Sequence, residues 1–349
     1  MCAELIPVDL HCHGVGKFNF TTNIRQPIWE IQKELERISA AAVMTFFISR
    51  PELPEFESFA ESYAKLKAAG KLPNIVGLAI EGPLLASSGG TPVWASWFPT
   101  VAEWKRISRL GRYGVIYAVY STCEHDDYHH SVSDSEIVKI LLDNNVVPAL
   151  GHFSKKDPKG TADRICALLD LVRDMGRGPI LTDHIFNDMP LLIKHAWRSE
   201  IEREQREGDL RRMRLQDWSL DNLADELGAV PAALINGAAQ GLVKLCMNFD
   251  GGHVDLAICK RTVDLVGAHN IFMMTDRIPG ADFAGAKLIS REGSPLLYRD
   301  DGIVAGSSST VALQINNMCK MGLCRQQIET ICSLAPREYL RCQAGQLHP

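Results

Sequence analysis

The chain has 349 residues, 46% hydrophobic and 23% charged, so it can bury a large core and has the composition of a folded globular protein. Its formal net charge of −5 argues against nucleic acid as a partner, because nucleic acids are bound by a basic face. No stretch reaches the ~20 apolar residues of a membrane span, and the N-terminus has no signal-peptide pattern. These features, with ten scattered cysteines, favour a cytoplasmic protein with reduced thiols and no membrane partner.

Short apolar segments recur along the chain and predict strands that are covered on both faces. They are Ile6–His11, Ala42–Ile48, Ile75–Ile80, Val115–Val119, Val146–Leu150, Ile180–Thr182, Val243–Phe249 and Ile271–Thr275. Amphipathic segments between them predict helices at Ile28–Ala40, Phe56–Ala69, Ser133–Asn144, Ala162–Met175 and Leu256–Val266. Eight strands with helices between them are typical of an α/β fold of the (β/α)8 TIM-barrel type. A doubly wound open sheet is the alternative.

Two segments interrupt this alternation of strands and helices. A charged, helix-prone insertion at about 195–228 extends the connection after the sixth strand. A hairpin excursion at about 281–304 has Asp300-Asp301-Gly302 as its turn signal, and a helical tail follows at about 310–342. We therefore expect one barrel domain over residues 1–349 with these three additions.

Side chains that bind metals or transfer protons follow five of the predicted strands. They are His11 and His13 after the first, Glu81 after the third, His152 after the fifth, His184 at the sixth and Asp276 after the eighth. Each of these residues alone is more often structural. Together they indicate a site, because active sites of TIM barrels lie at the C-terminal ends of the strands. Imidazole and carboxylate groups bind zinc, iron, manganese and similar cations.

His253 follows two glycines after the seventh strand, in Asn248-Phe249-Asp250-Gly251-Gly252-His253. Paired glycines let the backbone approach a ligand closely, so His253 is a candidate for contacting the substrate. The loop at 124–130 holds three histidines and three acidic residues. It is interpreted as a solvated loop, with extra ligands or a lid as alternatives.

Seven segments together resemble the N-acetylglucosamine-6-phosphate deacetylase family of the amidohydrolase superfamily. They are VDLHCHG (8–14), GLAIEGPLL (77–85), PALGHFS (148–154), TDHIFNDMP (182–190), NFDGGHVD (248–255), MMTDRIPG (273–280) and GIVAGSSST (302–310). They occur in the family's order and extend over the whole chain. The resemblance implies a metal-dependent hydrolase that removes an N-acyl group, with acetyl favoured, from an amino sugar or related small molecule.

The resemblance also implies a role for each residue. Glu81, His152 and His184 correspond to ligands of the metal that family members share, and His11 and His13 to ligands of a second metal. Asp276 corresponds to the general base and acid beside the metal, and His253 to the group that polarises the scissile carbonyl. The implied substrate contacts are Asn187, Asp188, His253, Gly306, Ser307 and Ser308. One or two divalent ions are expected, with zinc favoured and iron, manganese, cobalt or nickel as alternatives.

Three departures from the family pattern shape the expectation. The chain is expected to lack the small accessory β-sandwich of family members, and the family analogy favours a homodimer. The loop after Glu81-Gly82-Pro83, Ser87-Ser88-Gly89-Gly90-Thr91-Pro92, lacks the basic residue or histidine that the family tends to keep. Asp188 stands where the family has a small residue, and its carboxylate would repel a phosphate. Arg198 or Arg277 could still contact an anion.

Two other functions stay open on the sequence. The same chemistry serves a hydrolase of lactones, cyclic amides or phosphoesters. A catalytically inactive barrel that acts as a binding or assembly subunit is the second alternative.

Overall fold

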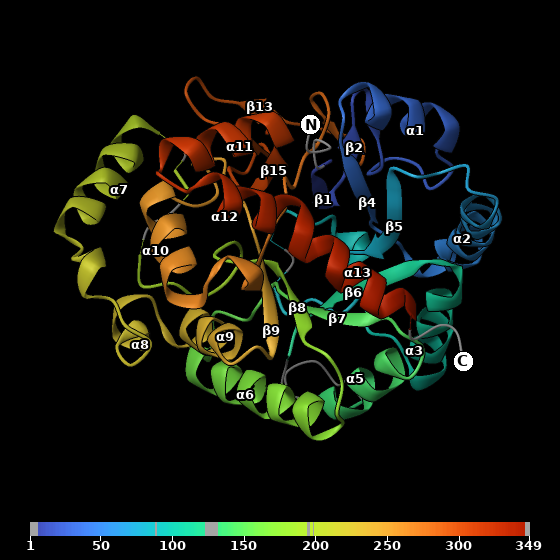
Figure 1. Ribbon diagram of the computed structural model, residues 1–349, viewed down its shortest axis with the longest axis horizontal. Coiled ribbons are helices and arrows are strands. Elements are labelled where there is room, and N and C mark those ends of the chain that lie inside the picture. Colours follow the sequence, from blue (N-terminus) through green and yellow to red (C-terminus); the bar gives the residue numbers. More distant parts are fainter. Residues whose placement is uncertain (1–5, 88, 123–131, 194–195, 198, 346–349) are drawn as a thin grey trace.

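A parallel barrel forms the centre of the structure, a computed structural model described over residues 6–87, 89–122, 132–193, 196–197 and 199–345 (Figure 1). Its strands are β1 Val8–Cys12, β4 Ala41–Phe46, β5 Ile75–Ile80, β6 Val115–Tyr120, β7 Val147–Leu150, β8 Ile180–His184, β9 Val243–Met247 and β10 Ile271–Met273. Nearly every residue of these strands is buried. The eight predicted strands are confirmed, with ends that shift by a few residues.

The strand order follows the chain, β1-β4-β5-β6-β7-β8-β9-β10, and every neighbouring pair is parallel. The two ends of the sheet meet through the residues after β10. The amide of Asp276 donates to the carbonyl of His11 at 3.0 Å, and the amide of His13 donates to the carbonyl of Arg277 at 2.9 Å. The sheet is thus a nearly closed barrel, and the predicted TIM barrel is confirmed. The doubly wound alternative is wrong, because the strand order never reverses.

Helices surround the barrel on its outside (Figure 1). They include α1 Ile28–Arg37, α2 Leu53–Ala68, α3 Val101–Ser108, α5 Asp134–Leu142, α6 Pro158–Asp174, α9 Ala229–Ala239 and α10 Leu256–Val266. Short 3₁₀ turns accompany them at Arg50–Glu52, Val93–Ala95, Arg109–Tyr113, Leu215–Asp217 and Ala268–Asn270. The five helices expected from amphipathic patterns are present, whereas α3 and α9 were not expected. None of the described helices combines the length and apolar character needed to cross a membrane.

Additions after β8 and β10 lie around the C-terminal ends of the strands. The connection after β8 contains α7 Glu200–Arg212 and α8 Leu223–Glu226. The segment after β10 contains β11 Asp282–Phe283, β12 Ala286–Lys287, β13 Ile289–Ser290, β14 Leu296–Tyr298 and β15 Val304–Ser307. Gly302, with φ of 79°, lies in the turn between the antiparallel strands β14 and β15. A small hairpin, β2 Gly14–Val15 and β3 Phe18–Asn19, follows β1.

The chain ends in a series of helices, the last of which covers the opposite end of the barrel. They are α11 Val311–Lys320, α12 Arg325–Glu329 and α13 Ala335–Gly345, with a π-helical turn at Thr330–Leu334 between α12 and α13. The Ser333 hydroxyl donates to the carbonyl of Ile6 at 2.9 Å, just before β1, and the Tyr339 hydroxyl donates to the carbonyl of Pro179 at 2.8 Å, just before β8. Figure 1 shows α13 crossing this end of the barrel. The C-terminal ends of the strands are therefore the end at which a cavity can open.

Candidate metal centre

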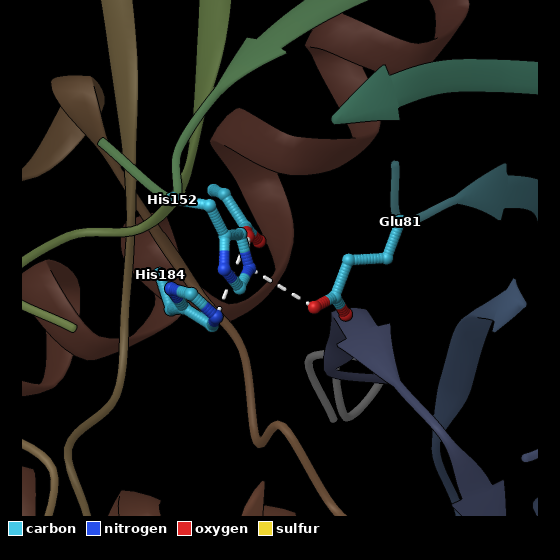
Figure 2. Close-up of side chains that lie close together, drawn as sticks. Glu81, His152 and His184 are labelled. Atoms are coloured by element: carbon cyan, nitrogen blue, oxygen red, sulfur yellow. Dashed lines mark ion pairs between the residues drawn. The ribbon is translucent and has the colours of Figure 1, made fainter. Parts of the chain in front are cut away.

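Five strand ends bring imidazoles and carboxylates together inside the barrel mouth. His11 lies in β1, His184 ends β8 and Glu81 directly follows β5, whereas His152 lies two residues after β7 and Asp276 three residues after β10. All five side chains are buried, with at most 4% of each residue exposed. Figure 2 shows Glu81, His152 and His184 pointing toward one another. The convergence that the sequence predicted is present.

The first group of candidate ligands consists of Glu81, His152, Asp183 and His184, whose ligand atoms lie within 4.8 Å of one another. His152 Nε2 lies 3.0 Å from Glu81 Oε1 and 3.2 Å from Asp183 Oδ2. His184 Nε2 lies 3.4 Å from the same Asp183 oxygen. Two ligands at about 2.0–2.1 Å from a tetrahedral ion stand about 3.3 Å apart, so these spacings fit a shared cation.

The second group consists of His11, His13 and Asp276. The Nε2 atoms of His11 and His13 lie 3.2 Å apart, and Asp276 Oδ1 lies 3.5 Å from His13 Nε2. Glu81 connects the two groups, because its Oε2 lies 2.8 Å from His13 Nε2 while its Oε1 faces His152. The described cluster therefore has the ligand types and the extent for one or two cations.

Several buried polar atoms of this cluster lack an aligned hydrogen-bond partner among the described residues. They are His11 Nδ1, His152 Nε2, His184 Nδ1 and both carboxylate oxygens of Asp183. Most of them approach an oppositely charged atom to about 3 Å, yet the angles do not suit a hydrogen bond. Buried polar groups are costly when unpaired. Nitrogen and oxygen atoms that converge without forming hydrogen bonds to one another are suited to bind a metal ion.

The electrostatics of the cluster also favour a cation. Burial lowers the pKa of His11, but the adjacent carboxylates of Asp183 and Glu81 raise it well above the ordinary value. Burial raises the pKa of Asp183, but the charges of His184 and His11 outweigh this effect and lower it. The site thus holds ionised carboxylates and attracts positive charge, which a bound divalent cation supplies.

Asp183 was not singled out from the sequence, although it directly precedes His184. Neighbouring residues of a regular strand point to opposite faces. In β8, however, Leu181 pairs with Lys244 and His184 with Cys246, so one extra residue is accommodated in between. Such a bulge re-aims side chains, and it brings both Asp183 and His184 into the site. β1 has a similar irregularity between Asp9 and Cys12, around His11.

Carboxylates and backbone oxygens orient the candidate imidazole ligands. His152 Nδ1 lies 2.9 Å from Asp188 Oδ2, and His13 Nδ1 lies 3.2 Å from the carbonyl of Thr45. Asp188 also accepts from Ser87 Oγ at 2.9 Å and from Lys155 Nζ at 3.0 Å. A metal-binding histidine commonly donates its second ring nitrogen to a carboxylate or carbonyl. Asp188 therefore contacts the ring nitrogen of His152 that faces away from Glu81, and it orients the imidazole.

A second row of side chains reaches the site from the loop after β9. Asp250 Oδ2 lies 2.8 Å from His253 Nδ1, and His253 Nε2 lies 3.4 Å from Asp276 Oδ2. Burial lowers the pKa of His253, but the charges of Asp250 and Asp276 raise it to about 10. His253 is therefore an imidazolium at neutral pH. Asp250 was not assigned a role from the sequence, and its position three residues before His253 was the available signal.

Asp276 faces both the imidazoles and the open cavity. Burial raises the pKa of its carboxyl, but the adjacent His253 and the charge of His184 lower it below the ordinary value. Asp276 is thus ionised at neutral pH. Its backbone is held by the 306–308 turn, since the amide of Ser307 donates to the carbonyl of Asp276 at 2.8 Å.

A cavity of about 720 Å³ opens above Glu81, His152, His184 and Asp276. Asn187 and Asp188, two of the predicted substrate contacts, line it. Gly306, Ser307 and Ser308 lie outside its lining. The Ser307 hydroxyl donates to the carbonyl of Thr275 at 2.8 Å, and the Ser308 hydroxyl donates to the carbonyl of Pro295 at 3.1 Å, so this turn braces Asp276.

Two predictions fall on parts of the chain that the structure does not describe. The histidine-rich loop at 124–130 and Arg198 lie outside the described residues. The alternative anion contact, Arg277, directs its Nη1 toward the carbonyl of Ser309 at 3.5 Å. It is absent from the described lining of the cavity.

The fold and the site define a TIM barrel with buried imidazoles and carboxylates that could hold metal ions. No protein-family model matches the sequence, and no curated protein matches it. Solved structures do match. A variant of N-acetyl-D-glucosamine-6-phosphate deacetylase from Mycobacterium smegmatis, in complex with N-acetyl-D-glucosamine-6-phosphate, is 18% identical, with a TM-score of 0.67 over 97% of this chain and 77% of that one.

Two further deacetylases of the same name give similar agreement. The Pasteurella multocida enzyme is 13% identical, with a TM-score of 0.68 over 97% of this chain and 77% of that one. The Thermotoga maritima enzyme is 17% identical, with a TM-score of 0.66 over 98% and 79%. The chain therefore has the fold of N-acetylglucosamine-6-phosphate deacetylases, as its sequence motifs predict.

Proposed function

We propose that this chain is a metal-dependent amidohydrolase that removes an N-acyl group, with acetyl favoured, from an amino sugar or a related small molecule. The convergence of Glu81, His152 and His184 beneath a cavity that Asp276 also lines carries this proposal. The shared fold with the deacetylases supports it. Zinc is the favoured ion, because the candidate ligands are imidazole nitrogens and carboxylate oxygens.

A bound divalent cation would lower the pKa of water and polarise the substrate carbonyl. Glu81, His152 and His184 would hold it, with Asp183 as a further candidate ligand and His11 and His13 beside a second ion. Because two groups of ligands are present, we propose one or two ions per chain.

Asp276 and His253 would perform the proton transfer and charge stabilisation. Asp276, ionised at neutral pH, accepts a proton from the attacking water. His253, as an imidazolium, stabilises the negative charge that develops on the carbonyl oxygen. Asp276 then donates its proton to the nitrogen as the carbon–nitrogen bond breaks. The products are a carboxylic acid and a free amine, and the protein groups return to their starting states.

Two further proposals concern the location and the assembly of the protein. We propose a cytoplasmic enzyme, since every cysteine in the described part of the chain is free. We propose a homodimer on the analogy of the family that the sequence resembles.

The proposal predicts a specific effect of the substitution Asp276→Asn. With N-acetylated substrates, kcat should fall about 10²–10⁴-fold, the usual contribution of a general acid–base group. The variant should keep at least one bound ion per chain, because the first group of ligands, Glu81, His152, Asp183 and His184, remains. Steady-state kinetics and elemental analysis of the same preparation measure both quantities.

Asp174→Asn provides a matched control, because Asp174 is an exposed carboxylate at the end of α6. It should leave kcat and metal content unchanged. Full activity of Asp276→Asn would remove Asp276 from the mechanism. Wild-type protein that cleaves only lactones, cyclic amides or phosphoesters would replace the proposed reaction, and metal-free protein without hydrolysis would favour an inactive barrel.

A further inference from the structure

The outer part of the cavity differs in chemistry from its floor. The floor carries Glu81, His152, His184 and Asp276, whereas apolar side chains dominate the described walls. One wall is formed by the chain after β8. Another is formed by the turn before β15 and by the first residues of β15. The apolar residues that line them are Met189, Pro190, Leu191, Leu192, Ile193, Ala196, Ile303, Val304 and Ala305.

Two large apolar side chains of these walls face solvent. Leu192 is 66% exposed and Ile303 is 39% exposed, and both line the cavity. Exposed apolar surface at the rim of a concave site is stabilised when a ligand covers it. These walls therefore suit an apolar part of a substrate.

Among the lining residues of the cavity that the structure describes, little is present to bind an anion. Lys155 is the one lysine or arginine among its described lining residues. Its Nζ lies 3.0 Å from Asp188 Oδ1, so its charge offsets a carboxylate that is itself mostly buried. Glu81 and Asp276 face the candidate cations. In the described walls, the charge of Lys155 is already offset by Asp188 and leaves little to balance a phosphate, which carries ≈ −1.5 to −2 charges at neutral pH.

A helix N-terminus also reaches the cavity, since Gly228 and Ala229 at the start of α9 line it. Helix N-termini bind anions through free backbone amides. Here Pro231 has no amide hydrogen, which removes one donor from the first turn. This helix end is therefore a poor substitute for basic side chains.

We propose that the substrate is an uncharged N-acetylated amine whose amine half carries an aliphatic or aromatic group, and that this group lies against Leu192 and Ile303. The inference rests on the proposed function, and of the two substrate classes proposed there it favours a related small molecule over an amino sugar. The acetyl group has few atoms and must reach the metal ligands at the floor. The amine half therefore occupies the remaining volume, where the apolar walls are.

The test compares three substrates that share the acetyl group: N-acetylbenzylamine, N-acetylglucosamine and N-acetylglucosamine 6-phosphate. With metal-loaded wild-type protein, kcat/KM for N-acetylbenzylamine should exceed both others by about tenfold or more, as expected for burying an apolar group. Leu192→Ser should reduce this preference, mainly through a higher KM for N-acetylbenzylamine. Ile201→Ser is the matched control, because Ile201 on α7 is 68% exposed and does not line the cavity.

Binding to the Asp276→Asn variant gives a readout that does not require turnover. Calorimetry should show N-acetylbenzylamine binding about tenfold more tightly than N-acetylglucosamine 6-phosphate. Preferred hydrolysis or tighter binding of the sugar phosphate overturns the inference while the proposed function stands. Tighter binding of N-acetylbenzylamine without hydrolysis of any amide by the wild type overturns the proposed function, and with it the substrate assignment, and leaves only a site that binds an apolar group. An equal effect of Leu192→Ser and Ile201→Ser on the preference also overturns the inference.

Discussion

Asp188 shows how a residue outside the candidate ligand set can control it. Its carboxylate accepts from His152, Ser87 and Lys155. These interactions lower its pKa, although burial raises it. An ionised carboxylate behind His152 fixes the orientation of the imidazole and directs Nε2 into the site.

Replacing Asp188 should therefore weaken metal binding. We expect Asp188→Ala to raise the Kd for zinc about 10–100-fold, the usual cost of losing such an outer partner. Lys155→Met is the comparison, because it removes only the solvent-facing partner of Asp188 and should have a smaller effect. Competition with a chromophoric chelator measures both values. An unchanged Kd in Asp188→Ala would show that Asp188 does not support His152.

Asp250 should control the pH range in which His253 works. The protonated form of His253 is the one that stabilises negative charge, and it prevails below the pKa of about 10. Asp250→Asn removes the leading cause of the raised pKa of His253. His253 should therefore lose its proton at a lower pH in the variant than in the wild type. The alkaline limb of the kcat/KM profile should move toward neutral pH. If the alkaline limb stays at the wild-type pH in the variant, activity does not depend on the protonation of His253.

The sequence predicts most site residues because each follows an apolar strand segment. His11, Glu81, His152, His184 and Asp276 all follow this rule, and the barrel fold brings strand ends together. Asp183 was missed because regular alternation places it on the opposite face from His184. The bulge in β8 depends on pairing with β9, which no local pattern reveals.

At the scale of elements, helix α7 stabilises the loop that carries His253. Arg206 is the one buried side chain of α7. Its guanidinium donates to the carbonyl of Gly251 at 3.0 Å and to that of Gly252 at 3.2 Å, and it lies 3.3 Å from Asp255 Oδ2. A mostly polar helix thus contacts the backbone just before His253.

Losing this contact should affect both stability and catalysis. Arg206→Met leaves buried carbonyls unpaired, so we expect about 1–3 kcal/mol of destabilisation and a lower kcat. Arg211→Met is the control on the same helix, because that side chain is 73% exposed, and it should change stability by less than about 0.5 kcal/mol. Denaturation and steady-state kinetics measure both effects. Equal stability and kcat in the two variants would show that α7 does not support the loop.

The amphipathic helices were predicted from sequence, whereas α9 and α3 were missed for different reasons. α10 has the expected amphipathic pattern. In contrast, α9 is buried at eight of its eleven positions, so its sequence has no polar face from which to identify a helix. α3 has a capping box, with Thr100 and Glu103 bonded reciprocally, and this signal was available.

At the scale of the whole molecule, barrel closure creates the site. Candidate ligands from His11 to Asp276 are far apart in the chain, and they meet because β1 pairs with the residues after β10. The π-helical turn and α13 cover the other end, where Ser333 and Tyr339 contact residues that precede the strands. In the part of the chain that the structure describes, this cavity therefore opens at the strand ends that carry the candidate ligands.

The metal content of the purified protein tests the central claim most directly. Elemental analysis should find at least one divalent ion per chain in the wild type, and very little in a variant that combines His152→Ala and His184→Ala. His269→Ala, at an exposed histidine, should retain the wild-type amount. Wild-type protein that is folded, free of metal and equally active in the presence of a strong chelator would contradict the account.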